Sequence, residues 1–369
     1  MFQRTGAPPR LPTQRHLRHN EALPSDIRVA LVGYGFVGKT LHAPLIEATA
    51  GLRLAVVASR QKEIVLSELP AVEVTDPQTA LTHENVDLVV IASPNDSHFS
   101  LARAALQAGK HVVVDKPFTT TVAEARELAA LSSVQGRLLS VFHNRRWDSD
   151  FLTVRTVIEQ GLLGDVLHFE SHMDRFRPQV RDRWRERPGP GSGLWFDLGP
   201  HLVDQALQLF GMPQKITATL ANQRAGAQTD DWVHVLLDYG SRKVILHGSL
   251  LAASGSPRFT VHGMRGSLIK RLPDPQESQL RAGMRPNDPE WGMDPDCASF
   301  FDGQGGPPHQ IKSQRGDYRE YYRAIMMALN TGSPNPVAPE DAINVMTVLE
   351  AAAASSARAR AINLVSEVN

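Results

Sequence analysis

Two short segments carry side chains that could move a proton. Asp115-Lys116-Pro117 closes an apolar, valine-rich run, and Asp197 and His201 stand at positions i and i+4 of Gly191–Asp204. Lysine is seldom buried without a partner, so its place after a buried strand indicates a catalytic group or a structural ion pair. A carboxylate beside an imidazole can fix its tautomer and raise its basicity, as a general base requires. Lys116, Asp197 and His201 are therefore the candidate catalytic residues.

Two other interpretations of the Asp197–His201 pair stay open. The pair could hold a metal ion, although no further cluster of ligand residues accompanies it, so we expect no metal site. His201 could equally be an ordinary core histidine. Pro200 opposes the regular helix that would place the pair on one face, because proline breaks or kinks a helix interior.

A glycine-rich segment, Gly33-Tyr-Gly35-Phe-Val-Gly38, joins the first apolar run to a helix-like stretch. Gly33 permits a tight turn, Gly35 lets the backbone approach a pyrophosphate, and Gly38 lets strand and helix pack closely. The helix N-terminus then offers unpaired N–H groups to phosphates. The segment predicts a dinucleotide site, with a purely structural turn as the alternative; its expected contacts are Gly33, Gly35, Phe36, Val37 and Gly38.

The strand ends that follow indicate which dinucleotide is bound. The second strand ends at Ser59-Arg60, where an NAD site would place a carboxylate for the ribose diol. A hydroxyl and a guanidinium suit a 2′-phosphate, so we expect NADP(H) over NAD(H). The alternative is that Arg60 stacks on the adenine or faces solvent. At the next strand end Ser93, Asn95 and His98 are further cofactor candidates, although Asn95 and His98 could instead cap a helix.

The pattern of apolar runs predicts two domains of different architecture. Valine-rich runs alternate with helix-like stretches at 97–108 and 121–132, which indicates βαβ units and a parallel sheet; the runs are 27–32, 54–58, 86–92, 111–115 and 138–142. After a helix at 151–160, strands come in succession and indicate a mainly antiparallel sheet, at 166–174, 216–222, 232–239, 243–251 and 258–262. We expect an α/β protein with a Rossmann dinucleotide-binding domain at 25–147 and an α+β domain at 148–369.

Other segments receive simpler predictions. Residues 1–24 are basic and proline-rich, which is typical of a disordered arm. Residues 271–310, rich in Pro, Gly and Asp, predict a long loop or an insert, and such loops are either functional or mobile. Helices are expected at 318–330 and 340–360, the second of which could pack back on the first domain.

Composition excludes several classes of protein. The 369 residues are 42% hydrophobic, enough for two domains with cores, and 39 basic side chains balance 39 acidic ones. With a net charge of zero, the chain lacks the excess of positive charge that is typical of a nucleic-acid-binding protein. One cysteine, Cys297, allows no intramolecular disulfide and points to a reducing compartment. No apolar run approaches the ~20 residues that cross a bilayer. We expect a soluble, cytoplasmic protein without nucleic-acid or membrane partners.

Several motifs together resemble the glucose–fructose oxidoreductase/inositol dehydrogenase/rhizopine-catabolism (Gfo/Idh/MocA) family: GYGFVG, AGKHVVVDKP, FHNRRWDSDF, RWRE and DLGPHLVDQALQLFG. The resemblance spans 27–365 and is greatest to NADP-dependent scyllo-inositol dehydrogenases, through HNRRWD, RWRE and the segment around Arg281-Ala-Gly-Met-Arg-Pro. It implies a Rossmann domain plus an open-faced sheet, with the active site between them. The lysine of an EKP-type motif and the Asp and His of a DxGxH-type motif match Lys116, Asp197 and His201. Asp115 stands where glutamate is usual, and Pro200 is a second departure.

The resemblance also implies a reaction. A secondary alcohol on a cyclic polyol or sugar, with scyllo-inositol and scyllo-inosose as the expected pair, would be oxidised reversibly by hydride transfer to nicotinamide. His201 would accept the hydroxyl proton, Asp197 would orient the imidazole, and Lys116 would stabilise the oxyanion, although lysine or histidine could be the final proton carrier. Expected substrate contacts are Lys116, His143, Asn144, Arg146, Asp197 and His201; Trp184, Arg185 and Lys116 are expected beside the cofactor.

Alternatives at this point are a reductase of another sugar or keto-sugar, and a regulator that binds a dinucleotide without turnover. An open apolar sheet face cannot remain in water, so we expect a homodimer or homotetramer.

Overall fold

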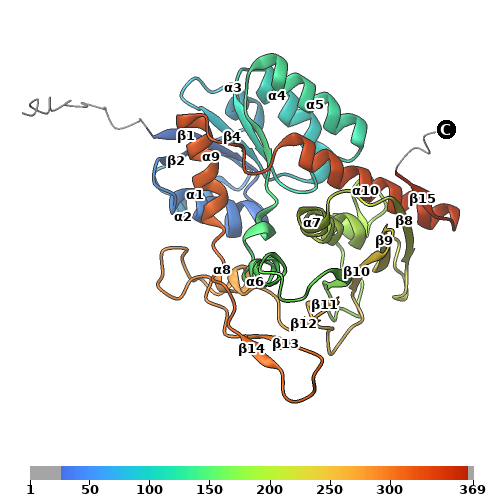
Figure 1. Ribbon diagram of the computed structural model, residues 1–369. Helices are drawn as coiled ribbons and strands as arrows, with labels where there is room; N and C mark the ends of the chain where they lie inside the picture. The colour runs from blue at the N-terminus through green and yellow to red at the C-terminus, as the bar shows by residue number, and fades with distance from the viewer. Residues whose placement is uncertain (1–25, 365–369) are drawn as a thin grey trace, which may run out of the picture.

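Two β-sheets organise the protein, whose computed structural model describes residues 26–364 (Figure 1). One sheet has six strands and the other nine. The arm expected at 1–24 lies outside the described residues. No helix within the described range is both long and apolar enough to span a membrane.

The first sheet is parallel throughout, with strand order β3-β2-β1-β4-β5-β6. Its strands are β1 (Ile27–Val32), β2 (Leu52–Ala58), β3 (Glu73–Thr75), β4 (Leu88–Ile91), β5 (His111–Val114) and β6 (Leu139–Val141). The order reverses at β1, which pairs with both β2 and β4, and ligands of such sheets bind at the carboxyl ends beside this reversal. The predicted Rossmann domain is confirmed, while the short edge strand β3 was not predicted.

Short helices connect these strands and cover the sheet. They are a π-helical turn η1 (Gly38–His42), α1 (Ala43–Glu47), α2 (Lys62–Glu68), α3 (Pro77–Thr82), the turn η2 (Asn95–Ser97), α4 (His98–Gln107) and α5 (Val122–Gln135). The sequence explains the bounds of α5: Thr121 and Glu124 form a capping box at its start, and Gly136 ends it with φ of 60°.

The second sheet runs β14-β13-β12-β11-β7-β10-β9-β8-β15 and is antiparallel except where β7 pairs with β10. Its strands are β7 (Val166–His172), β8 (Lys215–Ala221), β9 (Trp232–Tyr239), β10 (Arg242–Ser249), β11 (Phe259–Gly263), β12 (Gly266–Lys270), β13 (Ala298–Phe301), β14 (His309–Ile311) and β15 (Ile362–Asn363). Helices α7 (Gly193–Phe210) and α10 (Pro339–Arg358) contact one face, where Val244 and Leu246 are buried. The alternate residues Lys243, Ile245 and His247 are only partly buried, on the opposite face. The expectation of a mainly antiparallel sheet is confirmed.

The segment between β12 and α9 (Arg319–Thr331) differs from the expected loop. It contains α8 (Gln276–Arg281) and the strands β13 and β14, so the prediction of a long loop over 271–310 is wrong in part. These elements have three to six residues each, too few for a periodic pattern to be visible among the prolines and glycines. Near α8 lie the turn η3 (Asn144–Trp147) and α6 (Ser149–Glu159); a last turn, η4 (Trp184–Glu186), precedes α7.

The last helix packs against elements of both lobes. α10 contacts β8 of the second sheet as well as α5 and β6 of the first lobe (Figure 1). The carboxylate of Glu350 on α10 accepts a 2.7 Å hydrogen bond from the backbone N–H of Val122. The relative position of the two sheets, and of any site between them, is therefore held by packing and by polar contacts.

Candidate active site

A cavity of about 240 Å³ contains both predicted proton-transfer residues. Lys116 reaches it from the carboxyl end of β5, and His201 from α7. The remaining lining residues are Phe36, Val37, Leu41, Asp115, Asn144, Arg145, Arg175, Arg177, Arg181, Arg183, Arg185, Asp197, Leu198, Glu277 and Arg281. The cavity thus lies between the carboxyl end of the parallel sheet and helix α7 of the second lobe.

Lys116 is 9% exposed and bonded across the lobes. Its Nζ donates to the main-chain oxygen of Asp197 at 2.6 Å and lies 3.3 Å from the Asp197 carboxylate. Burial lowers the pKa of the lysine because it disfavours the ammonium, and the carboxylates of Asp197 and Asp115 oppose that effect. The net direction is downward, which makes Lys116 easier to deprotonate than an exposed lysine.

Asp115 is held beneath Lys116 by a buried histidine. Its Oδ1 lies 3.6 Å from Nε2 of His42, whose Nδ1 is 2.6 Å from the hydroxyl of Tyr322. Burial alone would raise the pKa of Asp115, but the ring of His42 and the ammonium of Lys116 hold it below its ordinary value. The aspartate that replaces the usual glutamate therefore sits as an anion beside the lysine.

Asp197 contacts cations and not the imidazole. Besides Lys116, its carboxylate lies 3.4 Å from Nε of Arg185 and 3.5 Å from an Nη of Arg175. Burial would raise the pKa of Asp197, but Lys116, Arg185 and Arg175 hold it well below its usual range. No side-chain hydrogen bond or ion pair joins Asp197 to His201 among the described residues. The expectation that Asp197 orients the imidazole therefore differs from the structure, in which it positions the lysine.

His201 is 6% exposed, and its Nδ1 is buried without a hydrogen-bond partner in residues 26–364. Burial lowers the pKa of this histidine well below 6.5, and the nearby charges of Lys116 and Arg145 add to the effect. The imidazole is thus neutral at neutral pH and can accept a proton.

Arginines dominate the wall of the cavity. Five of them follow β7 at alternate or near-alternate positions, Arg175, Arg177, Arg181, Arg183 and Arg185, and only Arg185 was predicted. Loss of hydration lowers the pKa of Arg177 to about 10, and the charges of Arg175, Arg181 and Arg183 add to it. The spacing is visible in the sequence, but nothing there shows that the segment turns toward Lys116. Arg281, on α8, and Glu277 were missed for the same reason.

The glycine-rich turn has the shape that a dinucleotide needs. Gly33 has φ of +101°, and a Cβ there would come within 2.6 Å of the Ala92 carbonyl oxygen. A Cβ at Gly38 would collide with the carbonyl oxygen of Gly33, whereas one at Gly35 would meet nothing within 4 Å. Gly33 and Gly38 must therefore be glycines because neighbouring backbone atoms leave no room for a side chain. The third glycine, Gly35, leaves the backbone open, as close approach of a pyrophosphate requires, so the residues fit this cofactor.

The end of β2 carries the residues expected at the 2′-phosphate. Arg60 is exposed, with no hydrogen bond or ion pair to another described residue, and Ser59 accepts a bond from the backbone of Gln61 at 3.0 Å. No carboxylate stands between Ser59 and Lys62.

The three cofactor candidates after β4 form hydrogen bonds within the protein itself. Asn95 donates to the carbonyl of Gly191 at 2.9 Å, and the hydroxyl of Ser93 lies 2.6 Å from that of Ser97. His98 is fully buried, with ring nitrogens 2.8 Å from the carbonyl of Pro117 and 3.0 Å from that of Ser93. His98 therefore has no ring nitrogen left for a cofactor, and its assignment as a cofactor contact is corrected to a structural one.

Two of the substrate candidates after β6, Asn144 and Arg146, differ in whether they line the cavity. Asn144 lines the cavity, but Arg146 does not. The guanidinium of Arg146 is 2.6 Å from Asp204 and 3.1 Å from Asp341, and it donates to the carbonyl of Pro336 at 3.0 Å. Because these partners engage all three of its nitrogens, the expected substrate contact is corrected to a buried ion pair.

Two further candidates do not line the cavity. His143 is 2% exposed and lies outside the lining. Trp184 also lies outside it, but its ring stacks under the guanidinium of Arg185, 4.4 Å from the ring centre.

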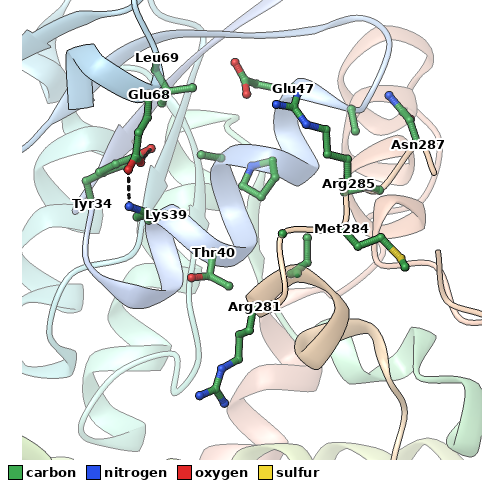
Figure 2. A pocket seen from close by; sticks show the side chains of 16 residues that line it. Tyr34, Lys39, Thr40, Glu47, Glu68, Leu69, Arg281, Met284, Arg285 and Asn287 are labelled. Atoms are coloured by element: carbon green, nitrogen blue, oxygen red, sulfur yellow. Dashed lines mark hydrogen bonds and ion pairs between the residues drawn. The ribbon is translucent and has the colours of Figure 1, made fainter. Parts of the chain in front are cut away.

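A larger cavity, of about 540 Å³, lies on the far side of the η1 turn (Figure 2). Tyr34, Lys39 and Glu68 line one side of it, and Met284 and Arg285 line the other. Arg281 points away from the other side chains and also lines the cavity of Lys116, so the end of α8 borders both cavities. The larger cavity contains neither Lys116 nor His201.

Comparison with known families decides the class of protein. Two family profiles match, described as an oxidoreductase family NAD-binding Rossmann fold over residues 27–143 and an oxidoreductase family C-terminal alpha/beta domain over residues 155–364. The chain belongs to the Gfo/Idh/MocA family of oxidoreductases. The resemblance stated from its motifs is thereby confirmed.

Members of the family with curated names include two long matches. The uncharacterized oxidoreductase YdgJ of Escherichia coli is 52% identical, over 88% of this chain and 95% of its own length. The scyllo-inositol 2-dehydrogenase (NADP(+)) IolW of Bacillus subtilis is 39% identical, over 92% and 96%. A solved oxidoreductase from Klebsiella pneumoniae is 55% identical, with a TM-score of 0.87 over 93% of this chain and 96% of that one.

Proposed function

We propose that the protein is an NADP(H)-dependent dehydrogenase that interconverts a secondary alcohol and a ketone on a cyclic polyol or sugar, with scyllo-inositol and scyllo-inosose as the first pair to test. The observation that carries the proposal is the cavity that Lys116 and His201 share, where burial lowers the pKa of both groups. Membership of an oxidoreductase family and the similarity to IolW support the reaction class and the first substrate.

The roles of the residues follow from their contacts. An imidazole nitrogen of His201 accepts the proton of the substrate hydroxyl, and Lys116 donates a hydrogen bond to the oxygen on which charge develops. Asp197 keeps Lys116 at the cavity. Arg60 and Ser59 would hold the 2′-phosphate, and the backbone around Gly35 the pyrophosphate. The bound dinucleotide would supply the hydride acceptor of the oxidation.

The test measures activity with NADP(H) and with NAD(H) on each of a set of inositol isomers and monosaccharides. The absorbance of the nicotinamide monitors oxidation and reduction. We expect turnover with NADP(H) and with at least one cyclic polyol or sugar. Turnover with another sugar alone would transfer the assignment to a different sugar or keto-sugar reductase. Tight dinucleotide binding without turnover of any substrate would overturn the enzymatic proposal in favour of a regulator.

A second candidate substrate class is favoured by the arginines of the cavity. With Arg145 and Arg281, the five arginines after β7 bring seven guanidinium groups to a wall that holds three carboxylates, Asp115, Asp197 and Glu277. Such a surface favours a sugar that carries a carboxylate or phosphate. The substrate panel should therefore include aldonates, uronates and sugar phosphates, and a kcat/KM higher for these than for neutral polyols would select this class.

Three further expectations from the sequence stay predictions. They are a cytoplasmic location, a homodimer or homotetramer, and a domain boundary between residues 147 and 148. Light scattering of the purified protein tests the second.

A further inference from the structure

The face of the second sheet that α7 and α10 leave uncovered brings two histidines and an aspartate together. His172 ends β7 and pairs in register with His247 on the neighbouring strand β10, and Asp174 lies two residues after His172. One ligand atom from each of the three residues lies within 4.8 Å of the others. Nε2 of His247 is 3.8 Å from a carboxylate oxygen of Asp174.

Three polar atoms of this group lack hydrogen-bond partners among the described residues. The side chain of Asp174 is 4% exposed, and both its oxygens are buried without a hydrogen bond to any described residue. Nδ1 of His172 is buried and unpartnered in the same way. A buried carboxylate without donors is costly, and native proteins avoid it, so these atoms indicate an absent partner that accepts lone pairs.

A neighbouring carboxylate prepares His172 to be a ligand. Nε2 of His172 lies 2.8 Å from an oxygen of Glu170, whose other oxygen is 2.8 Å from His168. A ring nitrogen that donates to a carboxylate leaves the second nitrogen with a free lone pair, and metal-binding histidines commonly have such a carboxylate behind them. In His172 the second nitrogen is the unpartnered Nδ1.

We propose that His172, Asp174 and His247 form a binding site for a divalent transition metal ion of the zinc type. Two imidazoles and one carboxylate are the ligands that Zn²⁺ prefers, and three protein ligands leave a fourth position for water or another ligand. Tetrahedral ligands at bond lengths of about 2.1 Å lie roughly 3.4 Å apart, so small side-chain movements close the site. The sequence predicted no metal because these ligands come from strands far apart in the chain.

The position of the site links it to the cavity of Lys116. His172 and Asp174 line a third cavity, of about 510 Å³, which shares Arg145, Arg175, Arg177, Glu277 and Arg281 with the cavity of Lys116. Arg175 follows Asp174 in the chain and contacts the carboxylate of Asp197 at 3.5 Å. A metal ion at Asp174 would therefore fix the start of the segment that carries the arginines.

The test uses full-length protein without a histidine tag, stripped of metal and titrated with zinc chloride against a chromophoric chelator. We expect one equivalent per chain, and a tetrahedral visible spectrum with cobalt chloride. Asp174→Asn and His247→Gln should each weaken zinc binding by at least ~100-fold, and Glu170→Gln, which acts through His172, by about 10–100-fold.

The matched control is His262→Gln. His262 lies on the same sheet face, bonded to Ser267 at 2.7 Å and outside the proposed ligands, so this variant should bind zinc like the original protein. Failure of the original protein to bind zinc or cobalt stoichiometrically would overturn the proposal. Equal binding by the original protein and folded Asp174→Asn would do the same. If Asp174→Asn does not fold, the comparison of Glu170→Gln with His262→Gln decides. Neither result depends on finding the substrate of the enzyme.

Discussion

The ammonium of Lys116 lies 2.6 Å from the main-chain oxygen of Asp197 and 3.3 Å from its carboxylate, although the two residues belong to different lobes. Lys116 ends a strand of the parallel sheet, and Asp197 is on the helix that also carries His201. The contact therefore holds the lysine at the place where the helix presents the imidazole.

Removal of either proton-transfer side chain should abolish turnover while dinucleotide binding stays largely intact. Lys116→Ala and His201→Ala are each expected to lower kcat by about 100- to 10,000-fold, because each removes a general acid–base or oxyanion contact. Steady-state kinetics and a fluorescence titration with NADPH check this. Lys312→Ala, at an exposed lysine that is not among the cavity lining residues, is the control. Near-normal kcat in either variant would refute the assigned roles.

Arg60→Ala should change the choice of cofactor. Loss of charged hydrogen bonds to the 2′-phosphate is expected to lower the NADP-to-NAD ratio of kcat/KM by about 10- to 100-fold. Arg53→Ala provides a matched control, since Arg53 is an exposed arginine of β2, the strand that Arg60 follows. A preference for NAD that Arg60→Ala leaves unchanged would show that the 2′-phosphate assignment is wrong.

Two glycines of the turn should respond differently to substitution. Gly35→Val is expected to leave thermal stability unchanged but to weaken dinucleotide binding strongly, because the protein leaves the space beside Gly35 open. Gly38→Ala should lower the melting temperature, because its Cβ would meet the carbonyl oxygen of Gly33. Calorimetry and NADPH titration of both variants separate the effects. Unchanged NADPH affinity in Gly35→Val would place the pyrophosphate elsewhere.

In the pH profile of alcohol oxidation, the loss of activity on the acid side should occur at low pH. The neutral imidazole of His201 is the proton acceptor, so activity is present above its pKa and is lost as the pH falls through it. Because burial and the nearby cations lower this pKa well below 6.5, kcat/KM should stay flat from neutral pH to below 6.5. A limb centred above pH 6.5 would contradict a buried neutral acceptor.

Arg146→Met should destabilise the protein without changing KM. The substitution leaves the Asp204 carboxylate buried without its main partner, at a cost of about 3–5 kcal/mol. The double variant Arg146→Met with Asp204→Asn removes the stranded charge and should recover part of the stability. Urea denaturation measures both variants. A large increase in KM with unchanged stability would restore Arg146 as a substrate contact.

The sequence predicted most of the first sheet because buried parallel strands are continuous apolar runs. Val89 and Val113, for example, lie in runs that no polar residue interrupts. It missed β3, whose three residues at the sheet edge are only partly buried and carry no such pattern. Lys116 and His201 could be found from their motifs. The partner of Asp197 could not be found in this way. The spacing of Asp197 and His201 suggested a contact between these two residues within one helix, whereas Asp197 contacts Lys116 of the other lobe.

The arginine wall and the histidine pair of the second sheet show the same limit. Arg177 and His247 belong to segments whose periodicity indicates strands and loops, not which side chains meet. Their partners are fixed by strand order, above all by the parallel pairing of β7 with β10 in an otherwise antiparallel sheet. Local sequence carries no record of that pairing.

Pro200 lies inside α7, and the helix continues through it to Phe210. A proline gives no N–H to the carbonyl four residues earlier, here that of Phe196, so this turn of the helix lacks one backbone hydrogen bond. Asp197 lies in the same turn, and its carbonyl oxygen accepts a 2.6 Å hydrogen bond from the ammonium of Lys116. The lysine is thus anchored partly to backbone, so truncation of the aspartate side chain removes a charge but not the anchor.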